Sequence, residues 1–120
     1  MGKEQNRAKG RYYEAQAEAF LKSQGYQILE KNYWTRFGEI DLIAQDGEYL
    51  VFVEVKYRSN SQMGFPEEAV TKKKQKTIFR CAQVYLMKKN ILSGIPCRFD
   101  IVAICGSQVT LLKNAFEGVG

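Results

Sequence analysis

The residues best suited to chemistry lie in two neighbouring apolar segments, GEIDLIA at 38–44 and EYLVFVEVKYR at 48–58. These segments contain two carboxylates, Asp41 and Glu54, and one amine, Lys56. Carboxylate oxygens are the ligands that Mg²⁺ and Mn²⁺ prefer, and a bound cation can acidify water and screen an anion. If the two segments bring these side chains together, the predicted chemistry is metal-assisted hydrolysis of an anionic substrate.

The pairing of the two segments decides whether the three side chains meet. Asp46-Gly47 is a strong signal for a two-residue hairpin turn, and counting back from it pairs Asp41 with Phe52. Directly opposed strand residues share a face, and alternate residues return to it. Asp41, Glu54 and Lys56 are therefore predicted to share one face of a sheet, with the backbones of the two acids about 7–8 Å apart.

The same residues also have a purely structural interpretation. Glu54 and Lys56 could form an ion pair, as Glu-x-Lys sequences do on half-exposed strands. Polar groups at the centre of an apolar strand are costly unless they are paired or bound to metal. Asp41 is predicted on the same face as Glu54 and Lys56, and Glu39 is predicted opposite Glu54. This gathering of carboxylates favours a metal site over a simple ion pair. The other face of the strand is expected to be the core face, and it carries Val51, Val53 and Val55.

The composition narrows the chemistry further. The chain has no histidine, which excludes Ser–His–Asp and Cys–His catalysis and most zinc chemistry. The cysteines have no CxxC spacing and are expected to be buried in a reducing compartment; they are Cys81, Cys97 and Cys105. Residues 1–20 contain no apolar signal region, and no apolar run could span a bilayer. We expect one cytoplasmic domain over residues 1–120, with residues 1–7 frayed.

Basic residues are concentrated in one part of the chain. The net charge is +5, and no acidic residue occurs from Ala69 to Phe99. A one-sided basic surface suits a polyanionic partner such as nucleic acid, although a lysine-rich helix can also be merely solvated. The candidate nucleic-acid-binding residues are Lys72, Lys73, Lys74, Lys76 and Arg80.

Hydrophobic periodicity and turn signals predict the order helix, three strands, helix, two strands. The predicted ranges are a helix at 9–24, strands at 26–34, 38–44 and 48–58, a helix at 71–89, and strands at 98–105 and 109–113. Thr71 is a plausible N-cap, and residues 59–68 are expected to form a mobile loop. The order αβββαββ predicts an α/β or α+β domain with a central mixed sheet flanked by helices.

The block GEIDLIA followed by LVFVEVKYRS resembles the PD-(D/E)xK nuclease motif. More narrowly, it resembles the YraN-like family of small bacterial proteins, which are similar in motif to archaeal Holliday junction resolvases. The resemblance extends from Arg11 to Ile104 and includes YEAQAEAFLKSQGYQIL, FPEEAVTKKKQKTIFRCAQVYL and RFDIVAI. It implies a restriction endonuclease-like fold.

The resemblance also implies a function and residue roles. Asp41 and Glu54 would be ligands of Mg²⁺ or Mn²⁺, with Glu14 completing the metal site, and Lys56 would be the catalytic lysine. Tyr13 departs from the family pattern, which usually has Gly at that position. The implied activity is a metal-dependent endonuclease that hydrolyses phosphodiester bonds of DNA, with branched or junction DNA as substrate and a homodimer by analogy. The alternative is a nucleic-acid-binding module that keeps the nuclease fold without cleaving.

Overall fold

The computed structural model describes residues 3–58, 70–91 and 94–117, and these residues form two helices and five strands. The elements are α1 (Lys3–Ser23), β1 (Gln27–Thr35), β2 (Gly38–Asp46), β3 (Tyr49–Arg58), α2 (Lys72–Lys88), β4 (Cys97–Cys105) and β5 (Gln108–Leu112). The predicted element order and fold class are confirmed. The boundaries shift by a few residues at most, except that α1 begins at Lys3, well before the predicted start at Lys9.

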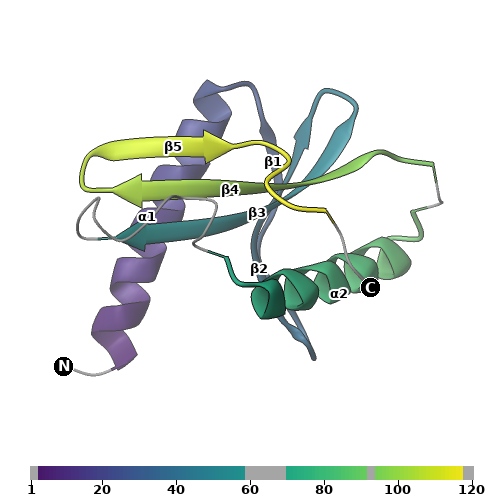
Figure 1. Ribbon diagram of the computed structural model, residues 1–120, viewed down its shortest axis with the longest axis horizontal. Coiled ribbons are helices and arrows are strands. Elements are labelled where there is room, and N and C mark those ends of the chain that lie inside the picture. Colours follow the sequence, from purple (N-terminus) through teal and green to yellow (C-terminus); the bar gives the residue numbers. More distant parts are fainter. Residues whose placement is uncertain (1–2, 59–69, 92–93, 118–120) are drawn as a thin grey trace.

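The strands form one mixed sheet in the order β1-β2-β3-β4-β5 (Figure 1). β1, β2 and β3 are an antiparallel meander, and β4 and β5 are also antiparallel. β3 and β4 are parallel, so the chain must cross over between them, and α2 lies in that crossover. β3 therefore lies at the centre of the sheet with a partner on each side.

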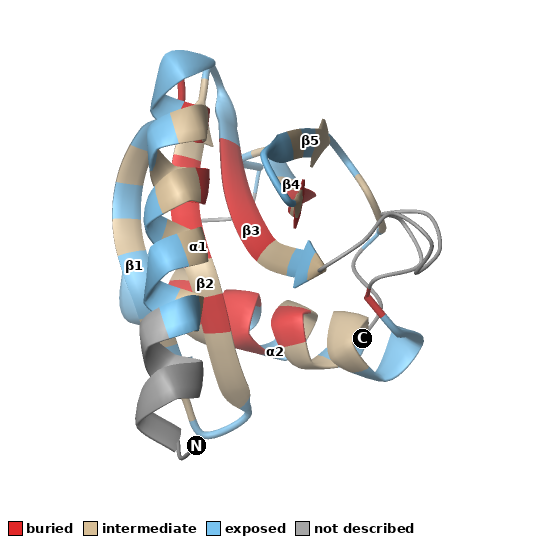
Figure 2. Cartoon of the chain, turned by 90° about the vertical axis from the view of Figure 1, so that its left-hand side faces the viewer, coloured by how far each residue is buried: buried red, intermediate tan, exposed pale blue. Residues whose placement is uncertain are grey.

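Each face of the sheet packs against a helix, as Figure 2 shows for α1 and α2. The α1 cluster consists of Ala17, Leu21, Tyr26, Leu42, Ala44, Val51, Val53, Val102 and Ile104. The α2 cluster consists of Ile40, Ile43, Leu50, Phe52, Val70, Ile78, Cys81, Ala82, Tyr85, Phe99 and Ile101. The prediction of a single core face on β3 is therefore incomplete, because Phe52 is as deeply buried as Val53. A strand buried on both faces makes any charge within it more costly.

Both helices have the local signals that their sequences predict. α1 ends at Ser23 and is capped by Gly25, which adopts φ 93°, and the amide of Tyr26 donates to the Leu21 carbonyl at 3.0 Å. α2 begins after Thr71, whose hydroxyl accepts a hydrogen bond from the Lys74 amide at 3.1 Å. The predicted N-cap is thus confirmed.

The β2–β3 hairpin differs from the prediction by its turn. Asp46 pairs with Tyr49, so the turn residues are Gly47 and Glu48 rather than Asp46-Gly47. Gly47 has φ 60° at the first central position, where a type II′ turn requires glycine. The predicted pairing of Asp41 with Phe52 is therefore wrong, because Phe52 pairs with Ile43. The correction moves the register by two residues, so within the paired stretch Leu42–Asp46 it does not change which side chains share a face.

Three smaller expectations have different outcomes. Cys81 is buried as expected, but Cys97 is exposed and Cys105 is intermediate, so a uniformly buried set is wrong. The expected loop at 59–68 lies outside the described residues. Within the described part of the chain, neither helix is long and apolar enough to cross a membrane.

Candidate active site

At Asp41 the side chains of β2 stop alternating regularly between the two faces of the sheet. Ile40 packs in the α2 cluster, whereas Leu42, two residues later, packs in the α1 cluster. In a regular strand the two would share a face. The break coincides with Asn32, which has φ 50° and lies across from Asp41 between the pairs Lys31–Leu42 and Tyr33–Ile40. The distorted backbone brings the Asp41 side chain within reach of groups from both sides of the sheet.

On one side, Asp41 meets two further carboxylates. Single carboxylate oxygens of Glu14, Glu39 and Asp41 all lie within 4.8 Å of one another. Glu14 comes from α1, and its Oε1 accepts a hydrogen bond from Nδ2 of Asn32 at 2.8 Å. Glu14 and Glu39 also line an open cavity of about 520 Å³ together with Gly10, Arg11, Asn32 and Trp34. This three-carboxylate cluster is therefore accessible to an ion from solvent.

On the other side, Asp41 meets Glu54 of β3. The paired stretch of the hairpin ends at Leu42–Val53, and Asp41 and Glu54 are the next residues of the two strands. The Val55 amide donates to Oδ2 of Asp41 at 2.8 Å. Burial, and after it the charge of Glu54, raises the pKa of Asp41 to about 8. Without a cation, this pair therefore keeps a proton at neutral pH.

Two lysines approach Glu54, which is only 4% exposed. Its Oε2 lies 3.9 Å from Nζ of Lys56 and 3.7 Å from Nζ of Lys74. Lys56 comes from the same strand, as the sequence predicts. Lys74 comes from the first turn of α2. Sequence reasoning assigned Lys74 to a general basic surface, because only the packing of α2 against the sheet brings it to Glu54.

The electrostatics of the cluster favour a cation. Burial is the largest cause of a raised pKa at both Glu14 and Glu39, and the charge of Asp41 raises the pKa of each further. Carboxylates that raise one another's pKa repel one another when ionised. A divalent cation bound between them would relieve this repulsion. All the available donors are carboxylate oxygens, which fit Mg²⁺ or Mn²⁺ better than a softer metal.

The sequence-predicted residues are thus brought together, with one change in their grouping. Asp41, Glu54, Lys56 and Glu14 all converge. The observed register is shifted by two residues from the one that predicted Glu39 opposite Glu54, and Glu39 instead joins Glu14 and Asp41. Tyr13, the departure from the family pattern, stacks on Tyr57 with ring centroids 4.2 Å apart. This contact holds α1 beside β3 and leaves Glu14 free to reach the cluster.

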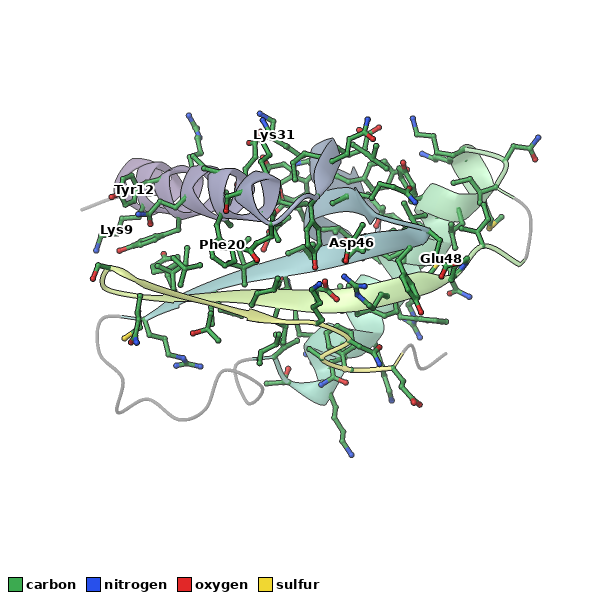
Figure 3. All side chains as sticks on the ribbon, turned by 90° about the horizontal axis from the view of Figure 1, so that it is seen from above. Lys9, Tyr12, Phe20, Lys31, Asp46 and Glu48 are labelled. Atoms are coloured by element: carbon green, nitrogen blue, oxygen red, sulfur yellow. The ribbon has the colours of Figure 1, made fainter. Side chains whose placement is uncertain are left out.

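A second polar network is separate from this site. Asp100 is fully buried and accepts hydrogen bonds from the Tyr26 hydroxyl, the Arg98 guanidinium and the Asn114 amide. Arg98 also donates to Asp46 at 2.7 Å. Figure 3 shows Asp46 far along the molecule from Lys9 and Tyr12 of α1. All these bonds join parts of the fold to one another, so the network of Asp100 is structural.

The other predicted nucleic-acid-binding residues lie on α2. Lys72, Lys73, Lys76 and Arg80 are exposed, whereas Lys74 is half-buried beside Glu54. The first turn of α2 holds three lysines and no acid. Since the positive pole of a helix is its N-terminus, these cations lie where anions would be favoured.

Comparison with known proteins places the chain among close relatives. The profile of the uncharacterised protein family UPF0102 matches residues 13–104. A UPF0102 protein of Lachnoclostridium phytofermentans is 50% identical over 107 residues, covering 89% of this chain and 91% of the relative. A UPF0102 protein of Vibrio parahaemolyticus is 43% identical over 119 residues, covering 98% of each chain. The matched region contains every carboxylate of the acidic cluster and both lysines, and the chain belongs to the UPF0102 family.

Proposed function

We propose that this protein is a metal-dependent endonuclease that hydrolyses phosphodiester bonds of DNA. The observation that carries the proposal is the position of Asp41, which meets Glu14 and Glu39 on one side and Glu54 on the other. Asp41, Glu54 and Glu14 are the proposed ligands of Mg²⁺ or Mn²⁺. Glu39 is a further candidate because it belongs to the three-carboxylate cluster.

A bound divalent cation would supply a more acidic water and charge screening for a phosphodiester. The chain itself contributes the rest of the proposed mechanism. The side chain of Lys56 is 37% exposed and its Nζ lies 3.9 Å from Oε2 of Glu54, so its amine could stabilise charge on the phosphate oxygens of a substrate bound beside Glu54. Lys74 approaches from α2, and its Nζ lies 3.7 Å from Oε2 of Glu54, where it can also attract a substrate phosphate.

The basic surface of α2 supports nucleic acid as the partner. The exposed cations Lys72, Lys73, Lys76 and Arg80 lie on the helix whose first turn borders Glu54. Phosphate contacts of this kind provide affinity without sequence preference and make it sensitive to salt. The DNA backbone would then run along α2 towards the carboxylates.

The proposal is tested by cleavage of labelled single-stranded, duplex, flap and four-way-junction DNA in Mn²⁺, Mg²⁺ or EDTA. We expect metal-dependent cleavage, strongest on branched or junction DNA, and a homodimer by size-exclusion chromatography. Lys56→Gln should lower turnover on the order of 10²-fold or more while keeping the thermal stabilisation that Mn²⁺ gives. Glu54→Gln should lose both. Glu48→Gln, an exposed carboxylate in the hairpin turn, is the matched control and should lose neither.

A second candidate is a nucleic-acid-binding module that does not cleave. The favouring observation is that Glu54 contacts two lysines and is not part of the three-carboxylate cluster found among the described residues. In this alternative the lysines neutralise Glu54 permanently and no cation joins the two acids. Salt-sensitive DNA binding that is unchanged by EDTA, with no cleavage of any substrate in the panel, would establish this alternative and reject the nuclease.

A further inference from the structure

A groove lies on the far side of the β1–β2 turn from the acidic cluster. It is an open cavity of about 620 Å³ between this turn and the outer face of α2. The turn contributes Thr35, Arg36 and Phe37, and α2 contributes Arg80, Gln83, Val84, Met87 and Lys88. The nuclease proposal uses only Arg80 from this set.

The groove is preformed, because the turn is fastened to α2. The Thr35 hydroxyl hydrogen-bonds with the Cys81 thiol at 3.1 Å and also accepts from the Phe37 amide at 3.0 Å. Gly38 packs so closely against α2 that a Cβ there would lie 2.8 Å from Cγ2 of Thr77. A surface that is already ordered loses less entropy when a ligand binds.

The lining combines cations with an aromatic ring. Arg36, Arg80 and Lys88 are exposed, and the groove has no carboxylate among its lining residues. The guanidinium carbons of Arg36 and Arg80 lie 4.8 and 5.7 Å from the ring centroid of Phe37. Phe37 is 36% exposed and Met87 is 79% exposed, so apolar surface is open between the charges.

Exposed cations, their guanidinium planes and a partly exposed ring together favour one kind of partner. Phosphates are attracted by the cations, and the flat faces of unpaired bases stack on aromatic rings and on guanidinium planes. A duplex offers phosphates but keeps its base faces inside the stack, so it cannot use Phe37. An acidic peptide would use the charges but gain nothing specific from the ring.

The groove and the acidic cluster are joined through consecutive residues. Trp34, which is 70% exposed, lines the cavity beside Glu14 and Glu39. Thr35, the next residue, lines the groove. A nucleic-acid strand that occupied both sites would pass from Trp34 around the β1–β2 turn, because consecutive residues of a strand point to opposite faces.

We propose that this groove binds an unpaired segment of nucleic acid, with a base stacked on Phe37 and the flanking phosphates held by Arg36, Arg80 and Lys88. The inference rests on the proposed function in one respect, that the substrate is nucleic acid. It adds that the substrate has a single-stranded arm, which the protein holds beyond the cleavage site.

The test is fluorescence anisotropy with a labelled DNA oligonucleotide of about 16 nucleotides, as a single strand and as a duplex. The buffer contains EDTA, so the result does not depend on metal binding or cleavage. We expect the wild-type protein to favour the single strand. Phe37→Leu should weaken single-strand binding about fivefold or more, equivalent to about 1 kcal/mol of lost stacking, and leave duplex binding unchanged. Arg36→Gln with Arg80→Gln should weaken both and reduce the salt dependence.

The control variant removes two positive charges outside the groove, as many as Arg36→Gln with Arg80→Gln removes within it. Lys22 and Lys31 are exposed and both pair with Glu18, and Lys22→Gln with Lys31→Gln should keep the single-strand preference. Each variant is checked for a cooperative unfolding transition, and Phe37→Tyr should restore binding if Phe37→Leu disturbs the turn. Unchanged single-strand binding in Phe37→Leu, or equal losses for both DNA forms, would overturn the proposal. If the protein prefers single-stranded to duplex DNA but cleaves no substrate, the proposed binding role of the groove is supported and only the nuclease proposal is rejected.

Discussion

Asp41 links the stability of the protein to the ionic state of its site. Its pKa is raised to about 8 in the folded chain, from an ordinary value of 3.8, because burial and then Glu54 disfavour its charge. The folded state therefore holds this proton more tightly than the unfolded state does. In the absence of metal, the contribution of Asp41 to stability is full below its ordinary pKa of 3.8 and is lost as the pH rises through about 8. The ionised form of Asp41 would be favourable in the folded protein only with a bound cation.

We expect Asp41→Asn to be more stable than the wild-type protein in EDTA at pH 9, on the order of 2 kcal/mol, because the neutral amide removes the uncompensated charge. Thermal unfolding at several pH values measures this. Mn²⁺ at about 100 times its dissociation constant should stabilise the wild-type protein by about 2.7 kcal/mol and leave Asp41→Asn unaffected. Equal metal-induced shifts in both proteins would show that Asp41 is not a ligand.

Asp46 has the opposite pH behaviour. Its hydrogen bond from Arg98 is the main cause that holds its pKa below the ordinary value, and Lys113 adds to this. The resulting stability is present above the unfolded-state pKa and is lost as the pH falls through the folded-state pKa. We expect Asp46→Asn to lose about 1 kcal/mol at pH 7, with solvent screening limiting the effect. In thermal unfolding the loss should shrink as the pH falls below the ordinary pKa of 3.8, and a loss that does not change in acid would indicate a packing defect instead.

At the scale of elements, Gly38 determines how closely the β1–β2 turn approaches α2. It has φ 147°, and an added Cβ would lie 2.8 Å from Cγ2 of Thr77. We expect Gly38→Ala to cost about 1–3 kcal/mol through backbone strain and this clash. Thr77→Ser removes the clashing methyl group and should restore part of the stability in the double variant. Thermal or denaturant unfolding of the four proteins separates the two contributions, and no restoration would mean that the backbone strain dominates.

The N-terminal turn of α2 should show a conflict between stability and binding. Lys72 and Lys73 lie at the positive pole of the helix, where cations are unfavourable. Replacing both by Ala should raise stability by about 0.3–1 kcal/mol and weaken DNA binding, with a shallower dependence on salt. Lys22→Ala is the matched control, since Lys22 lies in the last turn of α1, and there the loss of a lysine should lower stability. Tighter DNA binding by the α2 variant would contradict the proposed path of the substrate.

Local sequence signals predicted the elements and the shared face of the site, but not the contacts between elements. The period of the apolar residues and the cap at Thr71 are local, and both were correct. The predicted hairpin register was wrong because the same residues allow two turns, one centred on Asp46-Gly47 and one centred on Gly47-Glu48. The pairing of the two strands, and not the turn sequence, selects the second. The roles of Lys74 and Glu39 depend on how α2 packs and on the distorted backbone at Asn32. No local pattern encodes either of these.

At the scale of the whole molecule, charge is segregated. Acidic groups from α1, β2 and β3 converge around Asp41, while α2 and the β1–β2 turn present cations. An anionic polymer attracted by the cations is brought towards carboxylates that would repel it. A divalent cation at Asp41 reverses that repulsion, so both metal and salt concentration should control whether substrate reaches the site.

The parallel pairing of β3 with β4 also affects how the chain is made. On the ribosome, the β1–β2–β3 meander can form as it emerges, but the second edge of β3 waits until residues 97–105 have been synthesised. During that interval the backbone N–H and C=O groups of β3 are unpaired along this edge, and Phe52 still lacks its cover from α2, which is a hazard for aggregation between nascent chains. Glu54, Lys56 and Arg58 are charged residues of the same strand. Charges of this kind discourage edge-to-edge association, so we expect the residues of the site to disfavour aggregation of the unfinished protein as well.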